Sequence, residues 1–241
     1  MATRAPRSTA NETPPGRRLY GRRQGRKLRP GRRALVDRLL PRLEVALPAH
    51  GPLDPGSLFD PPVDDVWLEV GFGGGEHLAA QARAHPALGI IGCEPFIAGV
   101  AHLLSLVATD PPDNLRVFPD DARRLIDALP EASIGRIFVL FPDPWPKTRH
   151  HKRRFVNREN LDACARILRD GAEFRLATDH AEYCRWMLDH LRRHDAFAWL
   201  ARRPDDWRER PADWPETRYE AKARARGEKP VFLRFRRRPR R

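Results

Sequence analysis

The sequence is poor in cysteine, and the few cysteines that it has lie far apart. Cys93, Cys164 and Cys184 are the only three in 241 residues, and no two of them form a Cys-x-x-Cys pair. An odd number of widely spaced cysteines argues against a disulfide framework and against a cysteine zinc site. The sequence therefore predicts a protein of a reducing compartment that holds no metal.

Long apolar runs are also missing. No stretch approaches the roughly 20 residues that a membrane-spanning helix needs, and the N-terminus lacks the apolar core of a signal peptide. Its arginine-rich, acid-poor composition resembles that of transit peptides, but its prolines and glycines would break the amphipathic helix that such peptides form. We therefore expect a cytoplasmic protein that does not enter a membrane.

Acidic residues are nearly absent from the two ends of the chain. Residues 1–33 hold eleven lysines and arginines against one acid, and residues 234–241 hold six arginines and no acid, which leaves the body at −3 of the total +13. Basic arms on an ordinary body are typical of proteins that bind nucleic acid. We expect residues 1–33 to be an RNA-binding arm, disordered on its own. Attraction to a membrane surface or a role in solubility is the alternative.

Proline and glycine divide the rest of the chain. Residues 34–47 have the leucine spacing of a short amphipathic helix, interrupted by Pro41, and residues 48–62 are rich enough in Pro and Gly to form a loop. Residues 34–62 therefore lead into one folded domain over residues 63–236. A basic tail, residues 237–241, follows it.

The stretch VWLEVGFGGGE, from Val66 to Glu76, organises this domain. A short apolar run is followed by four glycines within five positions and then by residues that favour helix. Strand, glycine turn and helix in this order let a ligand approach bare backbone at a helix N-terminus. The dinucleotide fingerprint has a glycine where this chain has Glu76, which would repel phosphate. A zwitterionic ligand such as S-adenosylmethionine fits better; a purely structural turn is the alternative.

Strand-like and helix-like segments alternate from residue 66 onwards. The expected strands are 66–70, 88–93, 115–118, 136–141 and 173–177, and the expected helices are 76–85, 97–108, 122–129, 158–168 and 181–193. This alternation predicts an α/β fold, with a doubly wound, mostly parallel, Rossmann-like sheet and helices on both faces. Segments at 199–200 and 231–236 would add late edge strands. Ligands of such sheets bind at the carboxyl ends of the strands.

Carboxylates follow the ends of the expected strands. They are Glu69, Glu94, Asp121, Asp143 and Asp179, in strand order. An acid placed like Glu94, about 20 residues beyond a glycine loop, typically accepts hydrogen bonds from ribose hydroxyls. Asp121 and Asp179 have a plainer interpretation as helix N-caps. Because five acids fall in register, we expect them to line one cleft.

The sharpest signal is the segment FPDPWPKTRHHKRRF, from Phe141 to Phe155. Its alternating prolines fix the backbone and hold Asp143 and Trp145 rigidly at the cleft. An acid and a flat aromatic ring suit the edge and the face of a nucleobase. The cations that follow suit RNA phosphates and are Lys147, Arg149, Lys152, Arg153 and Arg154. The alternative is a solvated basic loop with Trp145 in the core.

Together these motifs resemble a known family. The run PDPWPKTRHHKRR, with LEVGFGGG upstream and ATDH at 177–180 and TRYE at 217–220 downstream, is similar to bacterial tRNA (guanine-N7)-methyltransferases. The similarity extends from about Val66 to Phe235, and YGRRQGR at 20–26 resembles the family's leading arm. The chain departs from the family pattern at Gly74 and Thr148, where members often carry a bulkier and a basic residue.

The resemblance implies a class I fold that uses S-adenosylmethionine to methylate a guanine N7 in tRNA, usually guanosine-46 of the variable loop. Carried over position by position, the cofactor contacts would be Glu69, Gly71, Gly73, Glu94, Asp121 and Asp143, with Asp143 also the catalytic residue. The substrate contacts would be Lys147, Asp179, Thr217, Arg218, Tyr219 and Glu220. Further RNA contacts would be Trp145, Arg149, Lys152, Arg153 and Arg154. We expect Asp179 and Glu220 to accept hydrogen bonds from the guanine N1–H and amino group.

Other functions remain open. An Asp-Pro-aromatic loop after the fourth strand also occurs in enzymes that methylate exocyclic amino groups of adenine or cytosine. A non-catalytic RNA-binding protein with the same fold is a second alternative, and Glu76 disfavours a nicotinamide dehydrogenase. We expect tRNA as the partner, and both a monomer and a homodimer agree with the sequence.

Overall fold

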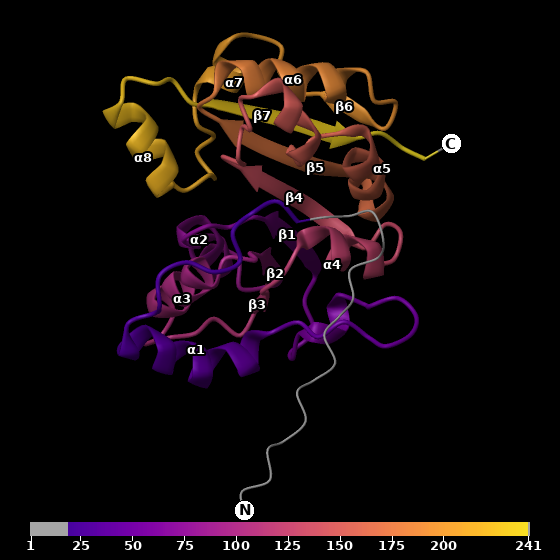
Figure 1. Ribbon diagram of the computed structural model, residues 1–241. Helices are drawn as coiled ribbons and strands as arrows, with labels where there is room; N and C mark the ends of the chain where they lie inside the picture. Colours follow the sequence, from indigo (N-terminus) through magenta and orange to yellow (C-terminus); the bar gives the residue numbers. More distant parts are fainter. Residues whose placement is uncertain (1–18, 241) are drawn as a thin grey trace, which may run out of the picture.

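The computed structural model describes residues 19–240, which build a seven-stranded sheet with helices on both sides (Figure 1). The strands are β1 (Asp65–Val70), β2 (Leu88–Cys93), β3 (Leu115–Phe118), β4 (Ile134–Leu140), β5 (Leu168–Thr178), β6 (Phe197–Trp199) and β7 (Val231–Arg237). The longer helices are α1 (Pro30–Leu43), α2 (Glu76–Ala84), α3 (Ile97–Leu106), α4 (Ala122–Ala128), α5 (Arg158–Ile167), α6 (Ala181–Arg192) and α8 (Arg218–Ala225). Shorter turns of helix are η1 (Gly56–Leu58), η2 (Thr148–Arg153) and α7 (Asp205–Arg208).

The strand order is β3-β2-β1-β4-β5-β7-β6. The first five strands are parallel to their neighbours, whereas β7 runs antiparallel between β5 and β6. The expected α/β fold with a mostly parallel sheet is confirmed. The expectation that residues 231–236 form an edge strand was wrong, because β7 is paired on both sides and β6 takes the edge.

Each face of the sheet buries its own hydrophobic cluster, as alternation along β1 shows. Val66 and Leu68 belong to the cluster beneath α4, α5 and α6, whereas Trp67 between them belongs to the cluster beneath α1, α2 and α3. Successive side chains of a strand point to opposite faces, so a strand buried on both faces is apolar throughout. The doubly covered sheet therefore follows from the apolar strands of the sequence.

Helix α1 begins earlier than residue 34 and ends before residue 47. Pro30 stands in its first turn, where a missing N–H is tolerated because that donor has no partner in the helix. Pro41 lies inside the last turn and does not interrupt the helix, which continues to Leu43. The helix thus starts within the segment expected to be a disordered arm. The part of that arm before residue 19 lies outside the described residues.

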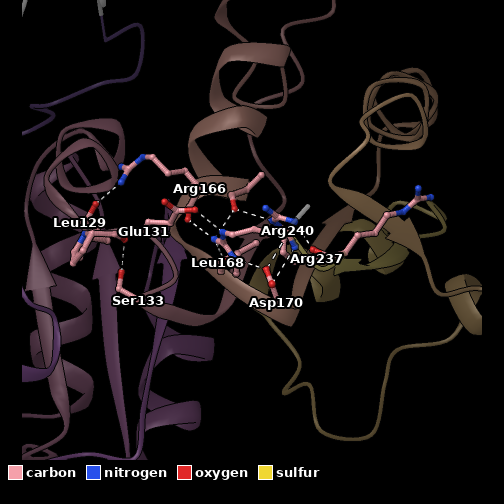
Figure 2. A network of polar contacts seen from close by, with 11 residues as sticks. Leu129, Glu131, Ser133, Arg166, Leu168, Asp170, Arg237 and Arg240 are labelled. Carbon is pink, nitrogen blue, oxygen red and sulfur yellow. Dashed lines mark hydrogen bonds and ion pairs between the residues drawn. The ribbon is translucent and has the colours of Figure 1, made fainter.

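The C-terminal arginines are engaged within the fold. The Arg240 guanidinium donates to the backbone carbonyls of Arg166 and Leu168, each at 2.7 Å, and pairs with Asp170 and Glu131 (Figure 2). Arg237 is buried and donates to a further carbonyl at the end of α5. At least two cations of the expected basic tail therefore stabilise the start of β5 instead of facing solvent.

Within residues 19–240, no helix is both long and apolar enough to cross a bilayer. The same residues bring together no group of three or more histidine, cysteine, aspartate and glutamate side chains that could hold a metal ion.

Candidate functional site

A cavity of about 530 Å³ opens at the carboxyl ends of β1, β2 and β4. This volume falls within the range of about 300–1,000 Å³ for small-molecule sites. The strand order reverses beside β1, and ligands of open α/β sheets bind at such a reversal. Its wall consists of the glycine turn after β1, the exit of β2, the proline loop after β4 and the start of α8. Residues 19–22 form another part of the wall.

The glycine turn can be built only from glycines at its key positions. Gly71, Gly73 and Gly75 have positive φ angles of 70°, 58° and 80°. A Cβ on Gly73 would lie 2.9 Å from the Tyr219 ring, so α8 closes directly over the turn. No atom lies within 4 Å of the place where a Cβ of Gly71 would be, and Gly71 lines the cavity. The turn therefore presents bare backbone to open space.

Glu94 anchors the glycine turn to the exit of β2. Its Oε2 accepts the backbone N–H of Gly73 at 2.8 Å, and its Oε1 accepts that of Phe96 at 2.9 Å. Burial raises the pKa of Glu94, the two backbone hydrogen bonds partly offset this, and the nearby Asp143 carboxylate raises it further. Glu94 and Asp143 line the same cavity. The expected grouping of these two acids is confirmed.

Asp121 also lines the cavity and caps α4. Its carboxylate accepts the backbone N–H of Arg123 at 3.1 Å and also binds the guanidinium of that residue. The prediction that Asp121 is an N-cap is therefore confirmed. The same residue also lines the cavity, so it can have both roles.

The proline loop holds Asp143 between two residues with unusual backbone angles. Phe141 and Trp145 have positive φ angles of 49° and 44°, which are uncommon for aromatic residues. The Phe141 ring stacks on Tyr219 with 6.4 Å between centroids and 19° between planes. Asp143 is exposed at the cavity, and Trp145 is half-buried in its wall and not in the core.

The buried Arg154 side chain holds the proline loop in place. Its guanidinium donates to the carbonyls of Pro144 (2.8 Å) and Trp145 (3.4 Å) and pairs with Glu182. The side chain is fully buried. Although the sequence suggested an RNA contact, the structure places the charge of Arg154 inside the protein.

The other cations of the loop lie nearer to solvent. Lys147, Arg149 and Lys152 are exposed. The Arg153 guanidinium lies 4.8 Å from the Trp145 ring centroid and 4.9 Å from that of Tyr20. These distances are typical of cation–π contacts. Arg153 therefore joins the N-terminal segment to the proline loop.

Residues 19–25 lie across the cavity between its two sides. Besides the Tyr20 contact, Arg23 pairs with Asp120 at 2.7 Å, and its carbonyl accepts the N–H of Ile97. A Cβ on Gly25 would lie 2.9 Å from the Phe96 ring. The segment that sequence analysis assigned to RNA thus also forms part of the cavity.

The expectation that all five acids line one cleft was wrong for Glu69 and Asp179, which do not line the cavity. Glu69 is buried and bound to His77 Nδ1 at 2.7 Å, while His77 Nε2 faces the Gln81 amide nitrogen at 3.2 Å. Asp179 is half-buried and pairs with Arg226 at 2.9 Å.

Only two of the four residues in the TRYE segment line the cavity. Arg218 and Tyr219 line the cavity, whereas Thr217 and Glu220 are buried outside its wall. Among the predicted residues, the structure therefore brings together Gly71, Gly73, Glu94, Asp121, Asp143, Trp145, Lys152, Arg153, Arg154, Arg218 and Tyr219.

Some wall residues had no individual signal in the sequence. Phe141, Phe96 and Tyr20 join the wall through tertiary contacts alone. The role of Thr217 could have been found, because Thr-x-x-Glu before a helix is the spacing of a capping box, and its hydroxyl does accept the N–H of Glu220.

Comparison with known proteins identifies several relatives. A family model described as "Putative methyltransferase" matches residues 64–233. A tRNA (guanine-N(7)-)-methyltransferase of Rhodospirillum rubrum is 54% identical, with 92% of this chain and 89% of the relative covered. The protein of the same name from Paramagnetospirillum magneticum is 52% identical, with 92% and 94% covered. That from Nitrobacter hamburgensis is 47% identical, with 96% and 93% covered.

Among solved structures, the 16S rRNA (adenine(1408)-N(1))-methyltransferase from Catenulisporales acidiphilia superposes with a TM-score of 0.51. It covers 82% of this chain and 99% of its own at 17% identity. At this identity the likeness shows the class I methyltransferase fold alone.

Proposed function

The chain belongs to the tRNA (guanine-N7)-methyltransferase family, and from this we propose that it methylates N7 of a guanine in tRNA with S-adenosylmethionine as donor. The target we propose is guanosine-46 of the variable loop. The protein would then act in the cytoplasm, where tRNA is modified.

One observation carries the proposal. Glu94, at the exit of β2, and Asp143, at the exit of β4, open into one cavity whose rim carries exposed cations. Carboxylates on the cavity wall suit a cationic small molecule, and exposed cations at its rim suit a polyanion. A methyl donor with a positively charged sulfur and an RNA substrate meet these two requirements.

The residues present fit S-adenosylmethionine. Gly71 offers bare backbone beside open space, and Glu94 retains lone pairs beyond those used by Gly73 and Phe96, which we propose accept ribose hydroxyls. When bound, S-adenosylmethionine supplies an electrophilic methyl group. Asp121 lies on the same wall, and we propose that it contacts the donor as well. Glu69 lies outside the cavity wall and binds His77, so it would reach the donor only by leaving that contact.

We propose that the guanine enters beside Asp143, between the proline loop and α8. Tyr219 and Arg218 line this side of the cavity, and Tyr219 is exposed enough to meet a base. Lys147, Arg149 and Lys152 would hold the flanking phosphates. Asp179 can reach the substrate only if its pair with Arg226 opens.

The chemistry requires little beyond orientation. Guanine N7 carries an in-plane lone pair and no proton, so its attack on the methyl group needs no base. The protein must align the two reactants, and alignment can contribute about 7–11 kcal/mol. Positive charge develops on the purine during transfer. A carboxylate held by a stiff loop, such as Asp143, stabilises that charge electrostatically.

Incubation with S-adenosylmethionine and unmodified tRNA, followed by nucleoside mass spectrometry and mapping, tests the proposal. We expect 7-methylguanosine at position 46. Methylation of an exocyclic amine, detected for example as N6-methyladenosine, would contradict the proposal. It would favour an enzyme that methylates exocyclic amino groups of bases. Cofactor binding by calorimetry without any methylation would favour a non-catalytic RNA-binding protein.

A further inference from the structure

The four residues of the TRYE segment do not face the same way. Arg218 and Tyr219, in the middle, line the cavity, whereas Thr217 and Glu220, at the ends, are 7% and 1% exposed and lie outside its wall. A motif that only bound substrate would present its charged carboxylate to the cavity. The burial of Glu220 therefore requires another explanation.

Thr217 begins α8. Its hydroxyl oxygen accepts the backbone N–H of Glu220 at 3.2 Å, which satisfies one of the unpaired donors at the start of the helix. This contact is half of a capping box, in which a glutamate three residues later usually returns a bond to the cap. Here the Glu220 side chain is turned elsewhere.

Glu220 joins α8 to the loop that precedes it. Arg210 Nε at 3.1 Å and Arg224 Nη2 at 2.7 Å both donate to Glu220 Oε1. Arg210 also donates to the carbonyl of Trp214. Trp214 is buried against the rings of Phe138 and Phe232, with centroids at 6.2 and 5.5 Å. The carboxylate thus ties the start of α8 to the core of the sheet.

The tethered end of α8 bears directly on the cavity. Tyr219 lies over Gly73 and stacks on Phe141, and Arg218 is 3.6 Å from Glu76 at the start of α2. A shift of α8 would therefore move the side chain that contacts both the glycine turn and the proline loop.

We infer that Glu220 is a positioning residue, which sets Tyr219 and Arg218 against the cavity through Arg210 and Arg224 and does not itself contact the guanine. The inference rests on the proposed function for its substrate and corrects one role that the resemblance assigns. Glu220 is 1% exposed and lies outside the cavity wall, so its carboxylate would have to move away from its present contacts to reach a guanine edge in the cavity. Removing one partner of such a pair is costly.

The test compares Glu220→Gln, Glu220→Ala and Arg210→Met on tRNA carrying guanosine or inosine at the target position. Inosine lacks the 2-amino group that a guanine-binding carboxylate would accept from. We expect each variant to lower kcat/KM by about 10- to 100-fold on both substrates, since a displacement of about 1 Å can cost about 100-fold. The guanosine-to-inosine ratio should stay at the wild-type value. Collapse of that ratio in Glu220→Gln, with normal activity of Arg210→Met, would overturn the inference.

A second experiment distinguishes a positioning role of Glu220 from a general loss of stability. Because Glu220 acts through Tyr219 and Arg218, Glu220→Gln in a background that carries both Tyr219→Ala and Arg218→Ala should lower kcat/KM by less than about twofold, as expected for coupled residues. An equal factor in both backgrounds would show a merely structural role and overturn the inference. Hydrogen exchange of the α8 amides, expected to rise in Glu220→Gln and Arg210→Met, reports on positioning without activity. If the wild type formed no 7-methylguanosine, the proposed function would fail while this exchange test still decided the role of Glu220.

Discussion

Glu94 holds the backbone N–H of Gly73 at 2.8 Å across 21 residues of sequence. Its other oxygen holds Phe96, so one carboxylate fixes both the glycine turn and the exit of β2. Asp143 lies near enough to raise the pKa of Glu94 beyond the effect of burial. Two carboxylates therefore lie close together in the part of the cavity where we propose that a sulfonium binds.

Asp143→Ala should abolish most turnover while tRNA binding is retained. The carboxylate stabilises charge that appears only during transfer, and loss of one such group costs about 10²–10³ in kcat. Single-turnover methylation and filter binding of tRNA measure the two effects separately. Asp143→Asn keeps the shape of the side chain and should lose nearly as much. Near-normal turnover of either purified variant would remove Asp143 from the mechanism.

Two glycines of the same turn should respond differently to alanine. Gly71 and Gly75 both have left-handed φ angles, so each substitution should cost about 1–2 kcal/mol of unfolding free energy. A Cβ on Gly75 would also lie 2.7 Å from the buried Leu103 side chain, which adds about 1–3 kcal/mol through overpacking. Urea unfolding of Gly71→Ala and Gly75→Ala measures which variant loses more unfolding free energy, and we expect it to be Gly75→Ala. Equal losses would show that Leu103 moves aside freely.

Glu173 should make stability depend on acid pH. Burial alone would raise its pKa, but hydrogen bonds from Arg234 and Arg175 outweigh burial and lower the pKa from 4.5 to about 2. Because the folded state favours the ionised form, the contribution is fully present above pH 4.5 and is lost as the pH falls towards 2.

Glu173→Gln should therefore cost about 1.5–3 kcal/mol of unfolding free energy at pH 6, the range for losing hydrogen bonds to a charged group. The gap between wild type and variant should narrow at pH 3. Chemical denaturation at both pH values measures the gap. A gap that stayed constant between the two pH values would mean that folding does not change the pKa of Glu173.

Arg240→Ala should destabilise the fold, whereas Arg238→Ala should not. Arg240 binds two carbonyls and two acids at the junction of α5 and β5, and its loss should cost about 1–2 kcal/mol of unfolding free energy. Arg238 is exposed, and surface substitutions usually stay within about 0.5 kcal/mol. Thermal or urea unfolding compares them at the same net charge. Equal stability of the two variants would contradict the network in Figure 2.

Local patterns predicted most of the fold. Except that β5 begins at Leu168 and not at residue 173, the strands and helices from Val66 to Arg192 agree with the structure to within two residues, because apolar strands, glycine turns and helix formers alternate there. The start of α1 was missed because Pro30 resembles a helix breaker in sequence, although it is well tolerated in a first turn.

The wall of the cavity was only partly predictable. Glu94, Asp121 and Asp143 follow strand ends, and parallel strands bring such positions to one edge. Whether a side chain faces the cavity depends on packing that sequence does not record. Glu69 turns to His77, and Arg154 turns beneath the proline loop, although their positions in the motifs suggested ligand contacts.

The left-handed angles of Phe141 and Trp145 bracket Asp143 within five residues of chain. Each costs about 1–3 kcal/mol that glycine would not incur. Directed evolution that screened this protein for heat tolerance alone would thus act on both sites, where relief of backbone strain by glycine competes with loss of the Phe141 and Trp145 ring contacts. A screen for methyl transfer would retain the aromatic residues, so the two selections should diverge first at these codons.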